Sequence, residues 1–164
     1  MTPALSLLSI GDNAPDVEGR RSDGSPLNLA DLRGRYVLVY FYPKDDTPGC
    51  TAEACSLRDS LQDLTDSGAD VIGVSADSWE SHRRFQEKHG LQFALAADPE
   101  RTIAAAYGVG RMLGVLPVFR RVSFLVGPDG RIVEVWPSVR PSTHAREVLE
   151  AVRRHSAGAP VAAG

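Results

Sequence analysis

The sequence has no block of basic residues and no long apolar run. Its 164 residues carry 18 Lys and Arg against 21 Asp and Glu, which gives a formal net charge of −3. This balance offers no electrostatic support for binding nucleic acid or an anionic membrane, so neither partner is expected. No apolar stretch approaches the roughly 20 residues that a membrane-spanning helix needs. The opening MTPALSLLSI has neither a positively charged start nor an Ala-x-Ala-like cleavage site, so a cytoplasmic location is expected.

Cysteine is scarce as well, with two residues, Cys50 and Cys55, in the stretch DDTPGCTAEAC (45–55). Cytoplasmic thiols are mostly reduced, and a disulfide there is more often transient and catalytic than structural. Neither the spacing of the two cysteines nor that of the four histidines is typical of a zinc site. The glycines of GVGRMLG (108–114) follow an expected helix rather than a strand, which argues against a nucleotide loop. No metal and no other cofactor is therefore expected.

What is present is an alternation of strand and helix signals over a length, residues 1–164, that suits a single domain. The apolar run YVLVYFYP (36–43) predicts a strand that is buried on both faces. Further strands are expected at 70–76 and 93–98, and hairpins at 17–29 and 121–137. Helices are expected at 51–67, 78–90, 99–108 and 142–156, an irregular connection at 109–119, and a frayed tail at about 157–164. This order predicts a mostly parallel α/β sheet covered on both sides, a thioredoxin-like three-layer sandwich with an N-terminal β-hairpin.

Cys50 follows the buried strand, a proline-rich turn and Gly49, so it is expected at the N-terminus of the next helix. Free backbone N–H groups and the positive end of the helix dipole meet there, and both favour a thiolate. The alternative is a buried and inert cysteine, for which this junction is an unfavourable place. Cys55 lies five residues further on, which in a helix separates the two Cα atoms by about 8 to 9 Å. Since a disulfide needs Cα atoms within about 7 Å, the folded helix keeps the thiols apart, and bonding requires its first turns to unwind.

The stretch YPKDDTPGCTAEAC (42–55) resembles the active-site segment of the peroxiredoxins. The family pattern is a proline, three residues, a threonine or serine, two residues and a cysteine, and it matches Pro43, Thr47 and Cys50 without a gap. The second cysteine, Cys55, is similar to that of the PrxQ or bacterioferritin comigratory protein subfamily. The resemblance extends over most of the chain, from residue 11 to residue 155.

This resemblance implies a thiol peroxidase that reduces hydrogen peroxide and organic hydroperoxides. Cys50 matches the peroxidatic cysteine, which becomes a sulfenic acid, and Thr47 matches the hydroxyl that polarises the peroxide. Pro43 matches the residue that shields the pocket from water, and Gly49 belongs to the same pocket. Cys55 matches the resolving cysteine, which forms an intramolecular disulfide that thioredoxin or a similar dithiol then reduces. A monomer is expected, as for many members of this subfamily.

An arginine completes the pattern that the resemblance implies. Arg121, in RRVSFLVGPDG (120–130), matches the residue that holds the thiolate and stabilises charge developing on the peroxide. Arg120 is adjacent, but alternation along the strand turns it to the other face. Read without the family pattern, Arg121 is equally consistent with a solvated charge at the end of a strand.

Other polar residues around the cysteines are expected to have lesser roles. Glu53 is expected in the first turn of the helix, where a carboxylate interacts favourably with the dipole and can tune the pocket. Lys44, Asp45 and Asp46 are expected as solvated loop charges. The connection 108–120 is shorter than in many relatives, and nothing in the sequence explains Arg20 and Arg21.

Two other functions remain open at this point. One is a thiol–disulfide oxidoreductase on the same fold, although the Trp-Cys-x-x-Cys pattern of that class is absent. The other is a redox-sensing interaction module, whose helix unwinds on oxidation and exposes a surface for a partner.

Overall fold

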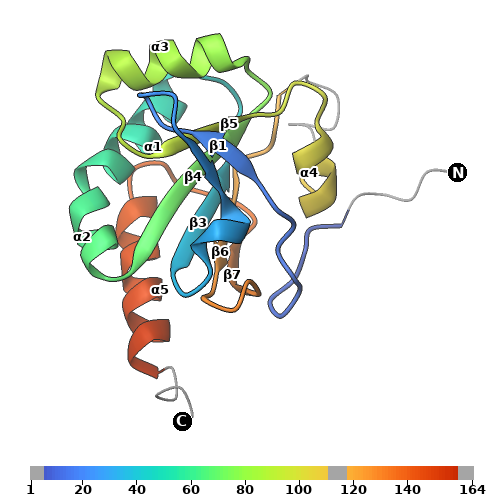
Figure 1. Ribbon diagram of the computed structural model, residues 1–164, viewed down its shortest axis with the longest axis vertical. Coiled ribbons are helices and arrows are strands. Elements are labelled where there is room, and N and C mark those ends of the chain that lie inside the picture. The colour runs from blue at the N-terminus through green and yellow to red at the C-terminus, as the bar shows by residue number, and fades with distance from the viewer. Residues whose placement is uncertain (1–5, 111–117, 159–164) are drawn as a thin grey trace, which may run out of the picture.

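A seven-stranded sheet runs through the computed structural model, which describes residues 6–110 and 118–158 (Figure 1). In chain order the elements are β1 Glu18–Arg20, β2 Pro26–Asn28, the 3-10 helix η1 Leu29–Leu32, β3 Tyr36–Phe41, α1 Pro48–Asp59, α2 Leu61–Asp66, β4 Ala69–Ser75, α3 Trp79–His89, β5 Ala94–Ala97, α4 Thr102–Tyr107, β6 Val122–Val126, β7 Ile132–Trp136 and α5 His144–Gly158. The predicted thioredoxin-like α/β sandwich with its N-terminal hairpin is confirmed. None of the described helices is long and apolar enough to cross a membrane.

The strands lie in the order β2-β1-β5-β4-β3-β6-β7. The three central strands β5, β4 and β3 are parallel, whereas β6 and β7 on one side and β1 and β2 on the other pair in antiparallel fashion. The expectation of a mostly parallel sheet was wrong, because the N-terminal hairpin also joins the sheet. Its strand β1 pairs with β5, and the short turns of both hairpins allow only antiparallel neighbours.

Strand β3 lies at the centre of the molecule and is buried along its whole length. Tyr36, Leu38 and Tyr40 point into a core shared with α1, α2, α3 and α5. Val37, Val39 and Phe41 alternate with them and pack on the other face, where α4 contributes Ala104 and Tyr107. A strand covered on both faces needs apolar residues at every position, which explains the continuous apolar run in the sequence.

Two helices begin or end away from their predicted positions. The helix expected at 51–67 begins at Pro48 and is interrupted at Ser60, where the backbone at φ −96°, ψ 0° separates α1 from α2. The helix expected at 99–108 begins only at Thr102, because Arg101 adopts the left-handed conformation with φ 60°. The carboxylate of Asp98 then accepts hydrogen bonds from the first free amides, those of Ile103 and Ala104.

The predictions for the chain end and for the connection after α4 are only partly within the described residues. Helix α5 continues to Gly158, so residues 157 and 158 belong to it rather than to the expected tail. Residues 159–164 lie outside the described part of the chain, as do residues 111–117 of the expected irregular connection. The ends of that connection lie together, since the Arg120 amide donates to the Gly110 carbonyl over 3.1 Å.

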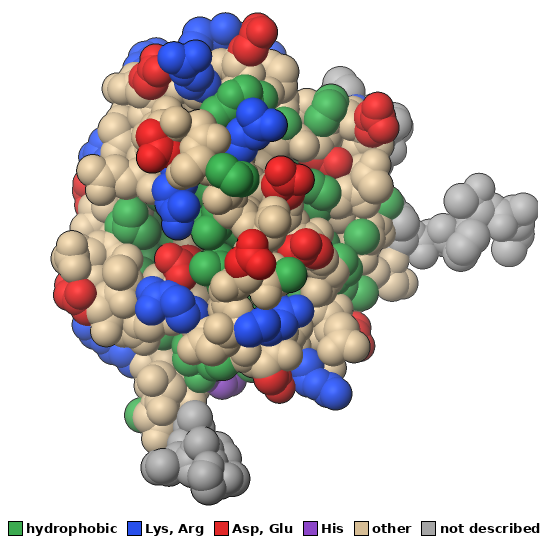
Figure 2. Space-filling model, viewed as in Figure 1, with side chains coloured by type: hydrophobic (Ala, Val, Ile, Leu, Met, Phe, Trp, Pro, Cys, Tyr) green, Lys and Arg blue, Asp and Glu red, His purple; other side chains and the backbone are tan. Residues whose placement is uncertain are grey.

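The surface carries charges of both signs. Figure 2 shows Lys and Arg side chains interspersed with Asp and Glu over the face in view. Arg20 lies above the ring of Trp79, with its guanidinium carbon 5.5 Å from the ring centroid. This cation–π contact accounts for Arg20, which the sequence left unexplained.

Candidate active site

The N-terminus of α1 carries the reactive segment. The buried strand β3 ends at Phe41, and the chain turns through residues 42–47 before Pro48 takes the first helical position. Thr47 precedes the helix in an extended conformation, and its carbonyl accepts the first helical bond from the Thr51 amide, 2.8 Å away. Cys50 is the third residue of α1 and so lies in its first turn, at the N-terminus of the helix as predicted.

Cys50 is 1% exposed, so it is more buried than the sequence suggested. It is not an isolated buried thiol, however, because a charged side chain contacts it. The Arg121 guanidinium donates from Nη2 to Cys50 Sγ over 3.4 Å. The sulfur atom therefore has a charged hydrogen-bond donor directly beside it.

Arg121 reaches Cys50 because of the strand order. Strand β6 pairs with β3 so that Val122 lies opposite Phe41, and Arg121 therefore stands where β3 gives way to the loop that leads to α1. The second arm of the guanidinium, Nη1, donates to Glu53 Oε1 over 2.7 Å. Burial disfavours the charge of Arg121, but Cys50 and Glu53 outweigh it and raise its pKa, so the cation is held in place. The predicted placement of Arg121 at Cys50 is thus observed.

Gly49 allows this approach. A Cβ atom built on Gly49 would lie 3.0 Å from Arg121 Nη2, tighter than an ordinary contact. The absence of a side chain here leaves room for the guanidinium above the first turn of α1. This gives a physical reason for the glycine in the sequence TPGC.

Glu53 differs from the expectation. Because α1 begins at Pro48, Glu53 is the sixth residue of the helix and not part of its first turn, so the predicted dipole contact was wrong. The side chain is fully buried, and burial raises the pKa of Glu53 to about 7, although Arg121 acts in the opposite direction. Among the described residues, Oε2 has no hydrogen-bond partner. Glu53 is therefore a buried carboxyl that shares Arg121 with the thiol.

Thr47 and Pro43 lie on the loop that enters α1. The Thr47 hydroxyl donates to the Lys44 carbonyl over 2.9 Å rather than capping the helix. Both Thr47 and Pro43 are partly buried. The hydroxyl thus has a fixed direction and a free acceptor position close to the first turn of α1.

Cys55 lies further along the same helix and is partly exposed. Both cysteines carry free thiols, and α1 continues without interruption from Pro48 to Asp59. Five residues of α-helix place the two Cα atoms about 8 to 9 Å apart, beyond the reach of a disulfide. The predicted separation by an intact helix is therefore present.

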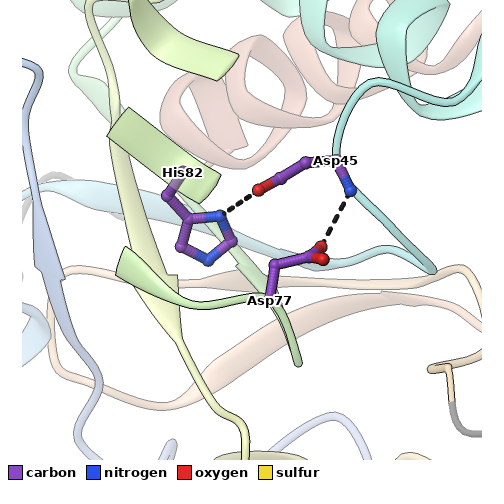
Figure 3. Close-up of side chains that lie close together, drawn as sticks. All are labelled: Asp45, Asp77 and His82. Carbon is purple, nitrogen blue, oxygen red and sulfur yellow. Dashed lines mark hydrogen bonds and ion pairs between the residues drawn. The ribbon is translucent and has the colours of Figure 1, made fainter. Parts of the chain in front are cut away.

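The prediction for the loop charges was wrong for Asp45. Lys44 and Asp46 are exposed, but Asp45 is buried and accepts three hydrogen bonds. They come from Tyr42 Oη over 2.6 Å and from Ser81 Oγ over 2.8 Å. The third comes from His82 Nδ1 over 2.7 Å (Figure 3). The partners Ser81 and His82 lie on α3, more than 35 residues away in the sequence. Local patterns cannot reveal such a contact, although His82 does occupy the apolar face of the predicted helix, as does Phe85.

A second buried histidine lies behind the site. His144, at the start of α5, contacts Ser123 Oγ on β6 through Nε2 over 2.8 Å. Burial lowers the pKa of His144 to about 4, and the charge of Arg121 acts in the same direction. His144 is therefore neutral at neutral pH, and it packs edge-on against Trp136.

A thioredoxin-like sheet that places a cysteine at a helix N-terminus, in contact with a partly buried arginine, defines a thiol-dependent peroxidase. The sequence pattern of the AhpC/TSA family matches residues 10–135, and the chain belongs to this family. The resemblance to the peroxiredoxins noted from the sequence is thereby confirmed.

The chain aligns with similar proteins over nearly the full length of each of them. Peroxiredoxin Bcp of Bacillus subtilis (strain 168) is 39% identical over 154 residues, which cover 89% of this chain and 96% of the relative. Peroxiredoxin Bcp of Escherichia coli (strain K12) is 40% identical over 156 residues, covering 93% and 100%. The structure of a PrxQ variant from Xylella fastidiosa superposes with a TM-score of 0.83 at 34% identity and covers 92% of this chain and 99% of that one.

Proposed function

We propose that Cys50 is the peroxidatic cysteine and reduces hydrogen peroxide and organic hydroperoxides. The observation that carries this assignment is the Arg121 guanidinium, which donates to Cys50 Sγ and Glu53 Oε1 at once. Organic hydroperoxides are included because a similar protein, the bacterioferritin comigratory protein of Xanthomonas campestris, is described as having alkyl peroxide reduction activity. That protein's structure superposes with a TM-score of 0.77 at 33% identity.

In the first step, the Cys50 thiolate attacks the terminal oxygen of the peroxide and breaks the O–O bond. Sulfur is oxidised to the sulfenic acid, and the other oxygen leaves as water or alcohol after taking up a proton. Arg121 lies where it can stabilise negative charge on both the sulfur and the departing oxygen. The Thr47 hydroxyl, whose hydrogen is donated to the Lys44 carbonyl, accepts a hydrogen bond from the peroxide, and Pro43 and Gly49 shape the pocket around it.

In the second step, the Cys55 thiol attacks the sulfenic sulfur and releases water, leaving an intramolecular disulfide. Because intact α1 holds the two cysteines too far apart, its first turns must unwind before this bond forms. Thioredoxin or a similar dithiol then reduces the disulfide and is itself oxidised. This assignment uses both free thiols of the chain.

The remaining proposals concern the setting of the enzyme. We place it in the cytoplasm as a monomer, with residues 1–164 forming one domain. An enzyme that begins each cycle from two free thiols needs a reducing compartment. One core on each face of a single sheet supports the assignment of one domain.

The direct test is the intact mass after one equivalent of hydrogen peroxide. The wild type should lose two hydrogens, whereas Cys55→Ser should gain one oxygen and Cys50→Ser should stay unchanged. A wild type that stays reduced for minutes would refute Cys50 as an activated thiolate. The same Cys55→Ser variant separates the thiol–disulfide oxidoreductase alternative, because a peroxidase still completes one turnover and a dithiol oxidoreductase loses disulfide transfer.

A further inference from the structure

Asp45 is held by hydrogen bonds at its carboxylate and at its backbone amide. The carboxylate accepts from Tyr42 and Ser81. It also contacts His82, and the amide donates to Asp77 Oδ2 over 2.8 Å (Figure 3). Asp77 is itself held by the Ser75 hydroxyl at the end of β4, 2.7 Å away. The side chains of Asp45 and His82 are 3% and 0% exposed, so water does not compete for these bonds.

His82 has acceptors at both ring nitrogens. Nδ1 faces Asp45 Oδ2 at 2.7 Å, and Nε2 faces the Ala96 carbonyl of β5 at 2.9 Å. The hydrogen bonds at Asp45 and at Ala96 together fix the position and direction of the ring. His82 therefore links β5, α3 and the loop before α1.

The next residue of the loop has an unusual backbone and is held by the same helix. Asp46 has φ 58°, in the left-handed region that a residue with a side chain rarely adopts. Its carboxylate binds Lys88 Nζ over 2.6 Å and His89 Nε2 over 3.0 Å, both on the last turn of α3. A strained conformation of this kind persists only where its surroundings fix it. Here side chains of α3 bind the loop at two consecutive residues, Asp45 and Asp46.

The two residues that α3 holds, Asp45 and Asp46, lie directly before the reacting groups in the sequence. Thr47 follows Asp46, and its hydroxyl donates to the carbonyl of Lys44, the residue before Asp45. The direction of that hydroxyl is thus set by the backbone on both sides of Asp45. Cys50 is three residues further on, in the first turn of α1.

We propose that His82 is a positioning residue for the peroxidase reaction. Through its hydrogen bond with Asp45 it fixes the loop so that the Thr47 hydroxyl meets a peroxide at the Cys50 sulfur. This inference rests on the proposed roles of Cys50 and Thr47. Asp45, Asp77 and His82 are also close enough to hold a metal ion, with ligand atoms within 4.8 Å of one another, but the hydrogen bonds among them already satisfy those atoms.

Two amide substitutions at His82 distinguish the contribution of its bond to Asp45 from that of its bond to the Ala96 carbonyl. In His82→Asn the amide nitrogen takes the place of Nδ1 and can still donate to Asp45, whereas in His82→Gln it takes the place of Nε2 and donates only to Ala96. The rate constant for Cys50 oxidation by hydrogen peroxide should fall about tenfold to a hundredfold in His82→Gln and by less in His82→Asn. Ser81→Ala removes one of the three bonds to Asp45 from a partly exposed residue and should slow the reaction a few-fold.

Alkylation of Cys50 by iodoacetamide separates a positioning role from a general disturbance of the structure, which would slow this reaction together with the peroxide reaction. This electrophile needs the thiolate but not the Thr47 hydroxyl, so its rate should stay within about twofold of wild type in all three variants. Asp98→Asn serves as the matched control, because Asp98 is a buried carboxylate that accepts two hydrogen bonds but holds α4 rather than the loop. It should leave both rates unchanged.

The outcomes distinguish this inference from the proposed function. If the wild type reacts with peroxide and His82→Gln reacts as fast, or if the peroxide and iodoacetamide rates fall together, His82 does not position the reaction. If the wild type does not react at all, the proposed function itself fails.

Discussion

At the residue scale, the site depends on one guanidinium that serves two anionic partners. Arg121 is 17% exposed and divides its donors between Cys50 and Glu53. A thiolate and a carboxylate in one buried pocket would repel each other, so the arginine between them is what makes a thiolate tolerable there. We therefore expect the rate of the peroxide reaction to depend on the position of the Arg121 guanidinium as much as on its charge.

Gly49→Ala tests that position without removing any charged group. The new Cβ would lie 3.0 Å from Arg121 Nη2 and must push the guanidinium aside by a few tenths of an ångström. We expect the peroxide rate constant to fall about tenfold, because a displaced donor stabilises the transition state less. The unfolding free energy should stay level or rise, since Ala is the better helix former by about 1 kcal/mol.

Gly110→Ala is the control for this substitution, since a Cβ there meets no atom of residues 6–110 and 118–158 within 4 Å. It should leave the peroxide rate unchanged in the same stopped-flow assay. If Gly49→Ala reacts as fast as wild type, the contact between Gly49 and Arg121 does not set the geometry of the site.

The site residues that could be predicted from the sequence belong either to one contiguous motif or to a second segment that the family pattern identifies. Pro43, Thr47 and Cys50 lie within eight positions, and Arg121 precedes a recognisable strand and turn. The contact between Asp45 and His82 was not predicted. The two residues are 37 positions apart, and their pairing depends on how α3 packs against the loop. The burial of Glu53 escaped for a different reason, namely that α1 begins three residues earlier than its apolar spacing suggested.

At the element scale, α1 must be both ordered and able to open. Its buried contacts come from Ala54 and Leu57 in its second half, besides Cys50 and Glu53. Its end at Ser60 separates it from α2, where Leu64 is buried independently. The break at Ser60 therefore allows α1 to unwind at its start while α2 keeps its place in the core.

Disulfide formation should consequently unfold the first part of α1 and leave α2 folded. Hydrogen exchange followed by mass spectrometry should show faster exchange over residues 48–56 in the oxidised wild type than in the reduced protein. The Thr51 amide, bonded to the Thr47 carbonyl in the folded helix, lies in this part. Residues 61–66 should stay protected in both states.

Oxidised Cys55→Ser is the control for this experiment, because it stops at the sulfenic acid and has no reason to unwind. It should exchange as the reduced wild type does. Unchanged exchange in a wild type whose mass shows the disulfide would mean that the two cysteines meet without the helix opening.

Elements were predictable where the local signal and the packing agree. The spacing of apolar residues and the Ser78 and Gly90 ends predicted α3 closely, because the Ser78 hydroxyl accepts from Ser81 and Gly90 is left-handed. The start of α4 was missed because Pro99 is a good first helical residue in general, but here Asp98 and a left-handed Arg101 shift the cap. The joining of β1 to β5 depends on a single residue pair and has no local signal.

At the scale of the whole molecule, two buried titratable groups act on stability in opposite directions. Burial raises the pKa of Glu53 from 4.5 to about 7, so the folded state binds more protons than the unfolded state between these values. Burial lowers the pKa of His144 from 6.5 to about 4, so there the unfolded state binds more protons. Stability therefore falls with rising pH through Glu53 and rises with pH through His144, and the two effects nearly cancel between pH 4.5 and 6.5.

Single substitutions should reveal each effect in the difference from wild type. In the difference between His144→Gln, which can still contact Ser123, and the wild type, the missing His144 effect is left, so the unfolding free energy should fall by about 3 kcal/mol relative to wild type as the pH rises from 4 to 6.5. In the difference between Glu53→Gln and the wild type, the missing Glu53 effect is left, so the unfolding free energy should rise by about 3 kcal/mol relative to wild type from pH 4.5 to 7. Urea denaturation at a series of pH values measures both. Because each slope is taken relative to wild type, the other titrating groups cancel. If the three proteins show parallel curves, Glu53 and His144 titrate alike in the folded and unfolded states, and the pocket around Arg121 is more hydrated than its burial indicates.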